Sequence, residues 1–565
     1  MKTNTDYNDE KKYRNYPFWD EDGEISPSQL TDFLEDNGFS QYFSSNDEEI
    51  KPMPVVISDG VITVKGDDST KRFVSDFIRK EEADNPALRK LRDKWAKTGR
   101  GGIPHIVEGL PYIGEDPPEE STTKRVKILR DKKGICYIPF KNGVVEITKD
   151  TVDLKPYKDL EKEGLIWRKS IRPHPIDISN LPKNLDYHKP IVKQIDVSAY
   201  VRFVSYAFKR DLIPNETKPI MDNNPLWEAT DTEEWIEGVN GFETSIGYLI
   251  HQFHPSVPKA IIFVDSESMS QQKAKGGTGK STSLESLKYI RNWTYIDGGK
   301  IHSDSGGSRR FMFDGVTPET QIILLDDINK DMRFRDILNT ITGPMEIDLK
   351  QKQKIVIPKD KKPKISMTSN FIIQGDDDSN TRRQHIVSFG TFLNRVSKRE
   401  ETNKSMSVEA LCGVYLFEEF SDKDWNDFYI YNILCVQKYF TTDLITPSNE
   451  SYKRALLANT VGDDTVFEWM EDWVNRDRIL RLYHNTGVAL SVIYKEFCDY
   501  FAGDHVLLTK WEEKEFVEKL FDYVMAREDV DWNPKQAAAG DTIRARRWRI
   551  STLTGQVDGV KIVDI

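Results

Sequence analysis

The segment AKGGTGKST at residues 274–282 constrains the fold of this chain more than any other feature. Its glycines allow successive backbone N–H groups to curl around phosphate oxygens, and a lysine and a serine follow them directly. In a loop of this kind the lysine reaches the β- and γ-phosphates of a nucleotide, and the serine hydroxyl is a ligand for Mg²⁺. The residues predicted to bind ATP are Gly276, Gly277, Thr278, Gly279, Lys280, Ser281 and Thr282.

The loop departs in two ways from the usual GxxxxGK[ST] pattern. Ala274 occupies the position of the first glycine, and the polar stretch SESMSQQKAK separates the loop from the apolar strand AIIFVD at residues 260–265. A chance Gly-Lys-Ser sequence in a turn is the alternative interpretation. The prediction of a nucleotide site therefore depends on other segments of the chain.

The segment QIILLDDIN supplies the second part of the predicted site. Four apolar residues precede Asp326 and Asp327, as in a buried strand that ends in paired carboxylates. P-loop ATPases use such a strand end to hold Mg²⁺ and to polarise the attacking water. Asp326 is expected to hold the metal and Asp327 to orient the water. The alternative is a core strand that meets a surface turn.

Two further strand-like segments carry polar residues suited to the same chemistry. KISMTSNF ends near Asn370, whose amide can bond to both the γ-phosphate and the attacking water. In SNTRRQHIVSF, Arg382 and Arg383 precede an apolar run, and arginine neutralises charge that develops on a transferred phosphoryl group. An ordinary strand end and a solvated turn are the respective alternatives. The predicted catalytic residues are Lys280, Asp326, Asp327, Asn370, Arg383 and Arg382, and the predicted metal ligands are Ser281 and Asp326.

The order of these four segments resembles that of the superfamily 3 helicases of DNA viruses, phages and plasmids, which are AAA+ ring motors. The resemblance covers residues 255–395, and its most specific part is ITGPMEIDLKQKQKIVIP at residues 341–358. The core PMEIDLKQK is similar to the corresponding segment of papillomavirus replicative helicases. The spacing from Gly343 to Asn370 resembles that of poxvirus-type primase–helicases.

In that family this segment builds a β-hairpin that grips one DNA strand inside the ring channel. The residues support a hairpin independently, because apolar and polar side chains alternate from Met345 to Lys350 with the period of a strand. Lys350, Lys352 and Lys354 are predicted to contact successive phosphates without reading bases. The alternative is an exposed edge strand guarded by lysines.

The resemblance also implies how subunits work together. Arg383 is expected to act as an arginine finger in the site of a neighbouring subunit, with Arg382 as the second candidate. The chain is then a homo-oligomer, usually a hexamer, that uses ATP and Mg²⁺ and moves 3′→5′ on single-stranded or forked DNA. A primase or polymerase of the same replication system is an expected partner.

The sequence divides into four expected domains. Residues 1–105 form an acidic region, with one helix starting at Ser26 and Pro27 and a charged helix within residues 79–102. Residues 106–230 form an α+β domain, which is similar to the pre-motor domain of phage and poxvirus-type primase–helicases. It contains an Asn-Gly hairpin in GICYIPFKNGVVEIT. Residues 231–400 are the motor.

Residues 401–565 are expected to form a helical linker and a winged-helix-like DNA-binding domain. VFEWMEDWV, LSVIYKEFCDYF and KEFVEKLFDYVM are three amphipathic helices, and Arg546 and Arg547 lie on a basic strand that can contact phosphates. A solvent-facing edge strand is the alternative for that segment. The expected fold class is α/β, an AAA+ P-loop core with an α+β N-terminal region and a mostly helical C-terminal domain.

The overall charge limits how the chain can bind DNA. Its 565 residues carry a net charge of −12, so any contact with DNA must come from local basic patches. The four cysteines form no CxxC pair, and no apolar run approaches the roughly 20 residues of a membrane helix. A reducing cytoplasm, that of a host cell for a viral protein, and no membrane contact are expected.

The sequence therefore predicts an ATP-dependent, ring-forming DNA helicase of viral, phage or mobile-element replication. One alternative is an AAA+ initiator that binds or melts an origin without processive unwinding. A P-loop kinase is another, and it leaves the lysine segment unexplained.

Overall fold

The structure is a computed structural model, and it describes most of the chain. The described residues are 18–43, 53–81, 87–98, 109–115, 124–209, 232–266, 277–300, 311–328, 332–348, 354–370, 382–397, 408–475, 490–525, 551–552 and 560–561. Within them, no helix is both long and apolar enough to cross a membrane.

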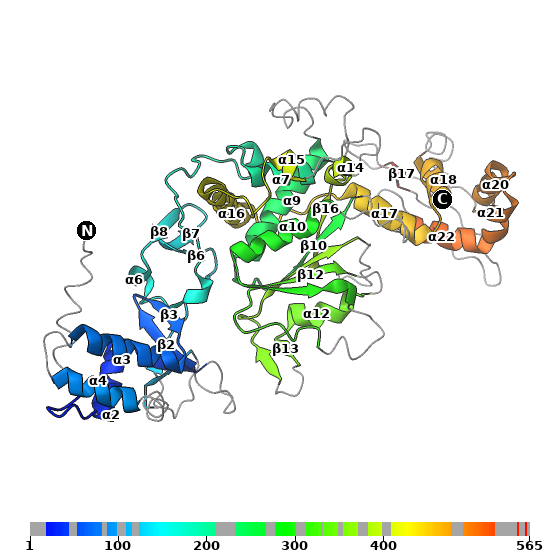
Figure 1. The fold of residues 1–565 in the computed structure, drawn as a ribbon. Coiled ribbons are helices and arrows are strands. Elements are labelled where there is room, and N and C mark those ends of the chain that lie inside the picture. Colours follow the sequence, from blue (N-terminus) through cyan, green and yellow to red (C-terminus); the bar gives the residue numbers. More distant parts are fainter. Residues whose placement is uncertain are drawn as a thin grey trace.

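A five-stranded parallel sheet lies at the centre of the chain (Figure 1). Its strand order is β11-β12-β15-β10-β16, and every neighbouring pair is parallel. The continuous apolar runs predict strands that are buried on both faces, and all six residues of β10 are buried. The strands are β10 (Ala260–Asp265), β11 (Trp293–Asp297), β12 (Ile322–Ile328), β15 (Lys364–Ser369) and β16 (Gln384–Phe389). The predicted α/β fold class is thus confirmed at the level of a mixed fold with a parallel sheet.

Separate hydrophobic clusters cover the two faces of this sheet, because successive side chains of a strand point in opposite directions. Ile261 and Phe263 of β10 pack with α7 (Ala199–Ala207), α9 (Glu233–Ile250) and α16 (Asp422–Thr442). Ile262 and Val264 pack with α12 (Arg335–Thr342) and the hairpin of β13 (Met345–Ile347) and β14 (Ile355–Ile357). Figure 1 shows these two groups of elements on opposite sides of the sheet.

The two long helices of the first face are fixed by local and by buried polar contacts. Thr232 caps α9 by accepting a hydrogen bond from the backbone of Trp235, and Ser421 and Asp424 form a capping box at the start of α16. Lys438 of α16 and Glu243 of α9 form a fully buried ion pair of 2.5 Å. Shorter elements complete this region: α10 (Lys280–Glu285), α14 (Phe392–Ser397), α15 (Val408–Cys412), η3 (Ile191–Lys193), η5 (Ser286–Tyr289) and η6 (Gly298–Lys300).

A second sheet of six strands lies toward the N-terminus, in the order β5-β4-β1-β2-β3-β9. Three helices belong to this part of the chain: α2 (Pro27–Asp36), which begins where the sequence predicts, α3 (Asp67–Glu81) and α4 (Ala87–Thr98). The strands are β1 (Phe39–Phe43), β2 (Met53–Ser58), β3 (Val61–Val64), β4 (Tyr112–Gly114), β5 (Lys124–Arg125) and β9 (Ile166–Trp167).

This part of the fold differs from the expectation in two ways. Strands from both sides of the expected boundary at residue 105 pair in one sheet. The sequence does not predict this pairing, because contacts between distant segments leave no trace in local composition. The charged helix expected within residues 79–102 is two helices, α3 and α4. Pro86 lies between them in the sequence and cannot donate a helical hydrogen bond. Leu91 and Trp95 of α4 are buried, so this helix is not solvated on all sides.

The predicted Asn-Gly hairpin is confirmed as β6 (Cys136–Phe140) and β7 (Gly143–Ile147), and β8 (Val152–Lys155) extends it to an antiparallel meander. Arg291 joins this region to the parallel sheet. Its guanidinium forms a buried 2.9 Å ion pair with Asp131 and donates to the backbone oxygen of Tyr137 at 2.9 Å. The elements α6 (Tyr157–Leu160) and η2 (Arg168–Ser170) follow the meander.

The C-terminal region has its own hydrophobic core, built around Trp469, Trp473, Phe497 and Phe516. The three amphipathic helices predicted here are confirmed as α18, α20 and α22. The helices of the region are α17 (Glu450–Val461), α18 (Asp464–Asn475), α20 (Leu490–Tyr500), α21 (His505–Lys510) and α22 (Glu513–Met525). A short antiparallel pair, β17 (Ser551–Thr552) and β18 (Val560–Lys561), follows them.

Candidate functional site

Three of the four predicted site segments converge at the carboxyl edge of the parallel sheet. The strands β10, β12 and β15 end there, and α10 begins beside them at Lys280. Ligands of open α/β sheets bind outside the carboxyl ends of the strands. Because β15 lies between β10 and β12, the residue that follows it, Asn370, lies between the lysine and the paired acids.

The end of the glycine loop has the backbone conformation that the sequence predicts. Gly277 and Gly279 have φ values of +92° and +97°, in the left-handed region that favours glycine. A Cβ atom on Gly279 would lie 3.0 Å from the ring of Phe203. Gly276 lies outside the described residues, and Thr282 is exposed on α10. Substitution of Gly279 would therefore disturb both the backbone and its packing.

The ammonium of Lys280 is buried among polar side chains. It forms an ion pair with Asp265, donates to Oγ1 of Thr278 at 3.1 Å and donates to Oδ1 of Asn370 at 3.0 Å. Thr278 in turn donates to Asp265 at 2.5 Å. Burial lowers the pKa of Lys280, and the carboxylate of Asp265 acts in the opposite direction. The result is a fixed, largely desolvated cation at the edge of the sheet.

The predicted metal ligands are in contact. Oγ of Ser281 donates to Oδ1 of Asp326 at 2.7 Å, and Oγ1 of Thr368 donates to the same oxygen at 2.6 Å. The hydroxyl of Tyr295 is 3.4 Å from the other carboxylate oxygen. Mg²⁺ is usually held by one or two protein oxygens together with substrate phosphates. Ser281 and Asp326 have the ligand chemistry for the protein share of such a site.

Asn370 connects the two halves of the cluster. Its Oδ1 accepts from Lys280, and its Nδ2 donates to Oδ1 of Asp327 at 2.8 Å. Asp327 has an exposed side chain and a φ of +53°, a conformation that few residues other than glycine adopt. Its carboxylate is therefore accessible to solvent and oriented by an amide.

The predicted arginines lie elsewhere in the same chain. Arg382 and Arg383 precede β16, which runs parallel to β10, so they lie at the amino edge of the sheet. A six-residue strand spans about 20 Å, and neither side chain reaches across that length to its own Lys280. Burial, and then the nearby Arg383, lower the pKa of Lys259 at this edge. Nη1 of Arg383 is buried and has no hydrogen-bond partner among the described residues.

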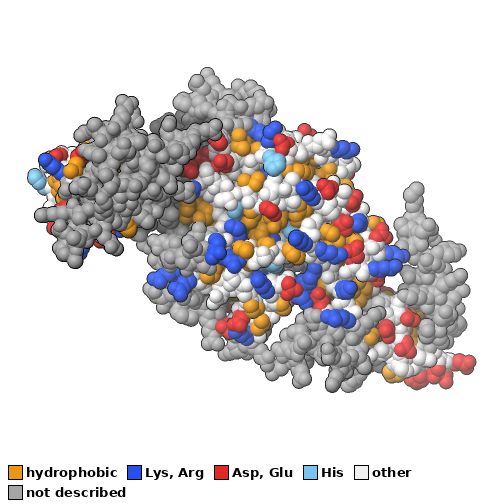
Figure 2. Space-filling model, turned by 180° about the vertical axis from the view of Figure 1, so that it is seen from behind, with side chains coloured by type: hydrophobic (Ala, Val, Ile, Leu, Met, Phe, Trp, Pro, Cys, Tyr) orange, Lys and Arg blue, Asp and Glu red, His pale blue; other side chains and the backbone are white. Residues whose placement is uncertain are grey.

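The predicted hairpin forms, although its tip lies outside the described residues. Met345 pairs with Ile357 in an antiparallel ladder, and Met345 and Ile347 are buried while Glu346 is exposed, as the alternation predicts. Lys354 forms an ion pair with Glu346. On the face drawn in Figure 2, basic and acidic side chains are interspersed. The structure does not describe the predicted DNA contacts Lys350, Lys352, Arg546 and Arg547.

Three residues of the cluster were missed by the sequence prediction. Asp265 ends an apolar strand, the same signal that identifies Asp326, but the first glycine of the loop lies eleven residues farther on, so the sequence does not link the two. Thr368 and Tyr295 have no sequence signal of their own, because threonine and tyrosine are common in strands.

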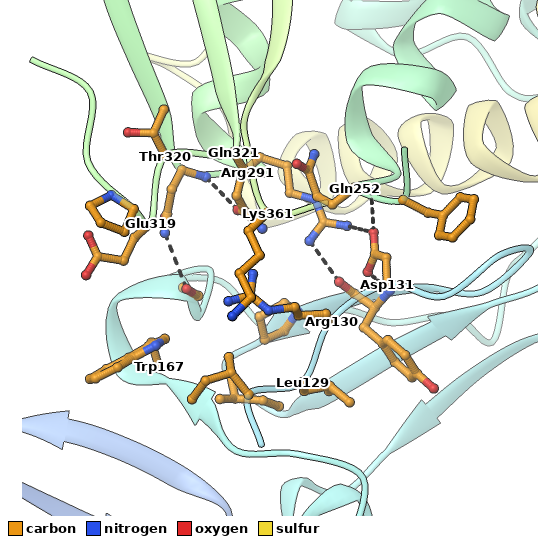
Figure 3. Close-up of a pocket in the computed structure, with 18 of the residues that line it drawn as sticks. Leu129, Arg130, Asp131, Trp167, Gln252, Arg291, Glu319, Thr320, Gln321 and Lys361 are labelled. Carbon is orange, nitrogen blue, oxygen red and sulfur yellow. Dashed lines mark hydrogen bonds and ion pairs between the residues drawn. The ribbon is translucent and has the colours of Figure 1, made fainter. Parts of the chain in front are cut away.

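A cavity of about 340 Å³ lies away from this cluster, where residues 128–170 meet the amino edge of the parallel sheet (Figure 3). The ion pair of Arg291 and Asp131 lies on one side of it, and Trp167 and Leu129 lie on the other. None of the predicted site residues that the structure describes lines this cavity. Their hydrogen bonds, rather than this hollow, identify the candidate site.

Comparison with known proteins adds little to this picture. No family model matches the chain, and no curated protein matches its sequence. Among solved structures, the apo A form of the NrS-1 C-terminal region is similar at 12% identity and a TM-score of 0.31, covering 80% of each chain. A second structure of that region has 13% identity and a TM-score of 0.23, and covers 60% of this chain and 78% of that one. Both TM-scores are low, so function is argued from the residues of this chain.

Proposed function

We propose that the chain is a Mg²⁺-dependent ATP hydrolase and the motor of a DNA helicase that serves viral, phage or mobile-element replication. One observation carries the hydrolase part of the proposal. The amide of Asn370 joins Lys280, from the glycine loop, to Asp327, from the acidic strand end. If the Gly-Lys-Ser sequence were a chance turn, it would not be expected to lie beside an acidic pair and an amide at the same edge of the sheet.

The residues of the cluster divide into three roles. Lys280 and the backbone of the glycine loop bind phosphate oxygens, and the ion pair with Asp265 yields to them when nucleotide enters. Ser281 and Asp326 would hold Mg²⁺, which would neutralise charge on the phosphates of the nucleotide. Asp327 orients the attacking water, with its carboxylate held by Asn370. These fixed charges act in a site that is partly shielded from water, where they are strongest.

Neither Arg382 nor Arg383 reaches Lys280 of its own chain, so in this proposal the arginine finger of each site comes from another subunit. Arg383 lies at the opposite sheet edge, so in this proposal it serves the site of a neighbouring subunit. Such an arginine typically accelerates hydrolysis by about 10³- to 10⁵-fold. The proposal thus includes a ring of identical subunits.

The DNA part of the proposal depends on the hairpin of β13 and β14 and on the family resemblance of residues 341–358. A buried apolar face anchors this hairpin, and lysines lie in its connecting segment. In an acidic chain, such lysines are suited to a polyanion. ATP-driven movement of the hairpin would pull single-stranded DNA through the ring.

The test is an assay of the purified full-length chain with Mg²⁺ and ATP. ATP hydrolysis is measured with and without single-stranded DNA, and unwinding is measured on forks with a 3′ or a 5′ tail. We expect DNA-stimulated hydrolysis and unwinding of the 3′-tailed fork. Hydrolysis with DNA binding but no unwinding would favour the initiator switch. Phosphate transfer to a small acceptor without DNA stimulation would overturn the motor in favour of a kinase.

A further inference from the structure

The strand that carries the paired acids is irregular at that point. Leu325 pairs with Met367, and the next matched pair is Ile328 with Ser369. Three steps along β12 therefore correspond to two steps along β15, so Asp326 and Asp327 together lie opposite the single residue Thr368. This is a β-bulge, a feature that re-aims side chains and is common beside active sites.

The bulge explains how neighbouring acids can serve one site. In a regular strand, successive side chains point to opposite faces, and Asp326 and Asp327 would be separated by the sheet. The left-handed conformation of Asp327, with φ +53°, breaks this alternation. Asp326 then contacts Ser281, and Asp327 contacts Asn370, within the same cluster. A strained conformation of this kind persists only when its surroundings hold it.

Thr368 provides that support through a single hydroxyl group. Its Oγ1 donates to Oδ1 of Asp326 at 2.6 Å and accepts from the backbone N–H of Asp327 at 2.8 Å. A threonine hydroxyl has one proton to donate and lone pairs to accept, so these two bonds fix its orientation. The side chain is only 1% exposed, so water cannot readily replace either bond.

We propose that Thr368 is a positioning residue that holds the bulge and thereby aims both carboxylates at the nucleotide site. The inference depends on the proposed hydrolase function, and it adds a residue that touches no reacting atom. Thr368 sets the orientation of the Asp326 oxygens for Mg²⁺, and it holds the backbone from which Asp327 reaches Asn370. A merely structural hydroxyl would stabilise the two strands without affecting Mg²⁺ or the chemical step.

The chain contains a matched control two residues away. Ser366 lies on β15, is fully buried and donates from Oγ to the backbone oxygen of Ile323 on β12 at 2.9 Å. Ser366→Ala therefore removes a buried hydroxyl between the same strands, away from the acids. Thr368→Val removes the other hydroxyl at almost constant volume, and Thr368→Ser retains it.

Two measurements distinguish positioning from simple stabilisation. The first is ATP hydrolysis over a range of ATP and Mg²⁺ concentrations. We expect kcat of Thr368→Val to fall by about 10- to 100-fold, the size of one lost hydrogen bond to a charged group, and the Mg²⁺ concentration that gives the half-maximal rate to rise. Thr368→Ser should recover most of kcat, and Ser366→Ala should match the wild type.

The second measurement is the equilibrium binding of ADP with and without Mg²⁺, which requires no turnover. Thr368→Val should keep the affinity for free ADP and lose most of the additional affinity that Mg²⁺ provides. If this variant does not fold, Thr368→Cys takes its place, because a thiol is close in size but bonds weakly.

The outcomes separate this inference from the proposed function. Wild-type kcat and Mg²⁺ dependence in Thr368→Val, or an equal loss in Ser366→Ala, would overturn the positioning role alone. Failure of Thr368→Ser to recover activity would overturn it as well. Absence of ATP hydrolysis in the wild type would overturn the proposed function and this inference together.

Discussion

Nζ of Lys280 lies 3.0 Å from Oδ1 of Asn370, although 90 residues separate them in the sequence. The other end of the same amide donates to Asp327 at 2.8 Å. An asparagine side chain has an acceptor end and a donor end, and here the acceptor faces a cation and the donor faces a carboxylate. Neither a carboxylate nor an apolar side chain at this position could make both contacts.

This arrangement predicts an order of severity for two substitutions. Asn370→Ala removes both hydrogen bonds, and ATP hydrolysis should fall by about 10- to 100-fold. Asn370→Asp should be worse, although it has nearly the same shape, because its carboxylate meets that of Asp327 and like charges repel. Steady-state hydrolysis by the two variants gives the comparison. An aspartate variant more active than the alanine variant would contradict the assigned orientation of the amide.

A mixing experiment tests the role of Arg383 in a neighbouring site. Asp327→Asn should bind ATP and hydrolyse it poorly, and Arg383→Ala should be equally inactive alone. In mixed rings, an intact site of an Arg383→Ala subunit meets the arginine of an Asp327→Asn subunit, so part of the hydrolysis should return. Hydrolysis is measured across mixing ratios, with Arg382→Ala as the control partner. A mixture no more active than its components would contradict action between subunits.

The lysines of the hairpin should separate DNA coupling from basal chemistry. Lys350→Ala with Lys352→Ala should leave basal hydrolysis near normal, while DNA stimulation and unwinding fall together. The slope of log affinity against log salt should shrink by roughly 0.7 for each lost contact with single-stranded DNA. Lys354→Ala is the matched control, because its ammonium already pairs with Glu346 and its effect should be smaller. Normal unwinding by the double variant would show that the hairpin does not grip DNA and that its lysines only protect an exposed edge strand.

Buried histidines should make the fold sensitive to acid. Burial lowers the pKa of both His251 and His254 to about 4. An unfolded histidine titrates near about 6.5, so below that pH the unfolded chain binds more protons than the folded one. Stability is then fully present above pH 6.5 and is lost as the pH falls toward 4, by up to about 1.4 kcal/mol per pH unit for each histidine.

Thermal unfolding at pH 7 and pH 5 checks this prediction. His254→Gln should lose less stability between the two pH values than the wild type. His188→Gln, at an exposed histidine, should lose as much as the wild type. Equal losses of stability in all three proteins would contradict the assignment of the acid sensitivity to the ring of His254.

The sequence predicts the parts of the site that depend on local pattern. Apolar runs that end in polar residues identify β10, β12 and β15, and the Asn-Gly pair identifies the hairpin of β6 and β7. Strand order is not local, so nothing in the sequence indicates that β15 lies between β10 and β12 and brings Asn370 to Lys280. The bulge at Asp327 is also invisible, because it arises from pairing with Thr368 and not from a glycine or proline. Strand pairing is also the reason why the boundary expected at residue 105 is wrong, because strands from both sides of that residue join one sheet.

The most direct test of the central claim is the rate of ATP hydrolysis by Lys280→Met beside Lys288→Met. The two lysines are eight residues apart, but Lys280 is buried against Asp265 and Asn370, whereas Lys288 is half-exposed beside the rings of Tyr289 and Trp293. We expect Lys280→Met to lose at least about a hundredfold in rate, because it removes a fixed charge from the phosphate site. Lys288→Met should hydrolyse ATP as the wild type does. A Lys280→Met protein that is folded and as active as Lys288→Met would contradict the assignment of this cluster as the ATP site.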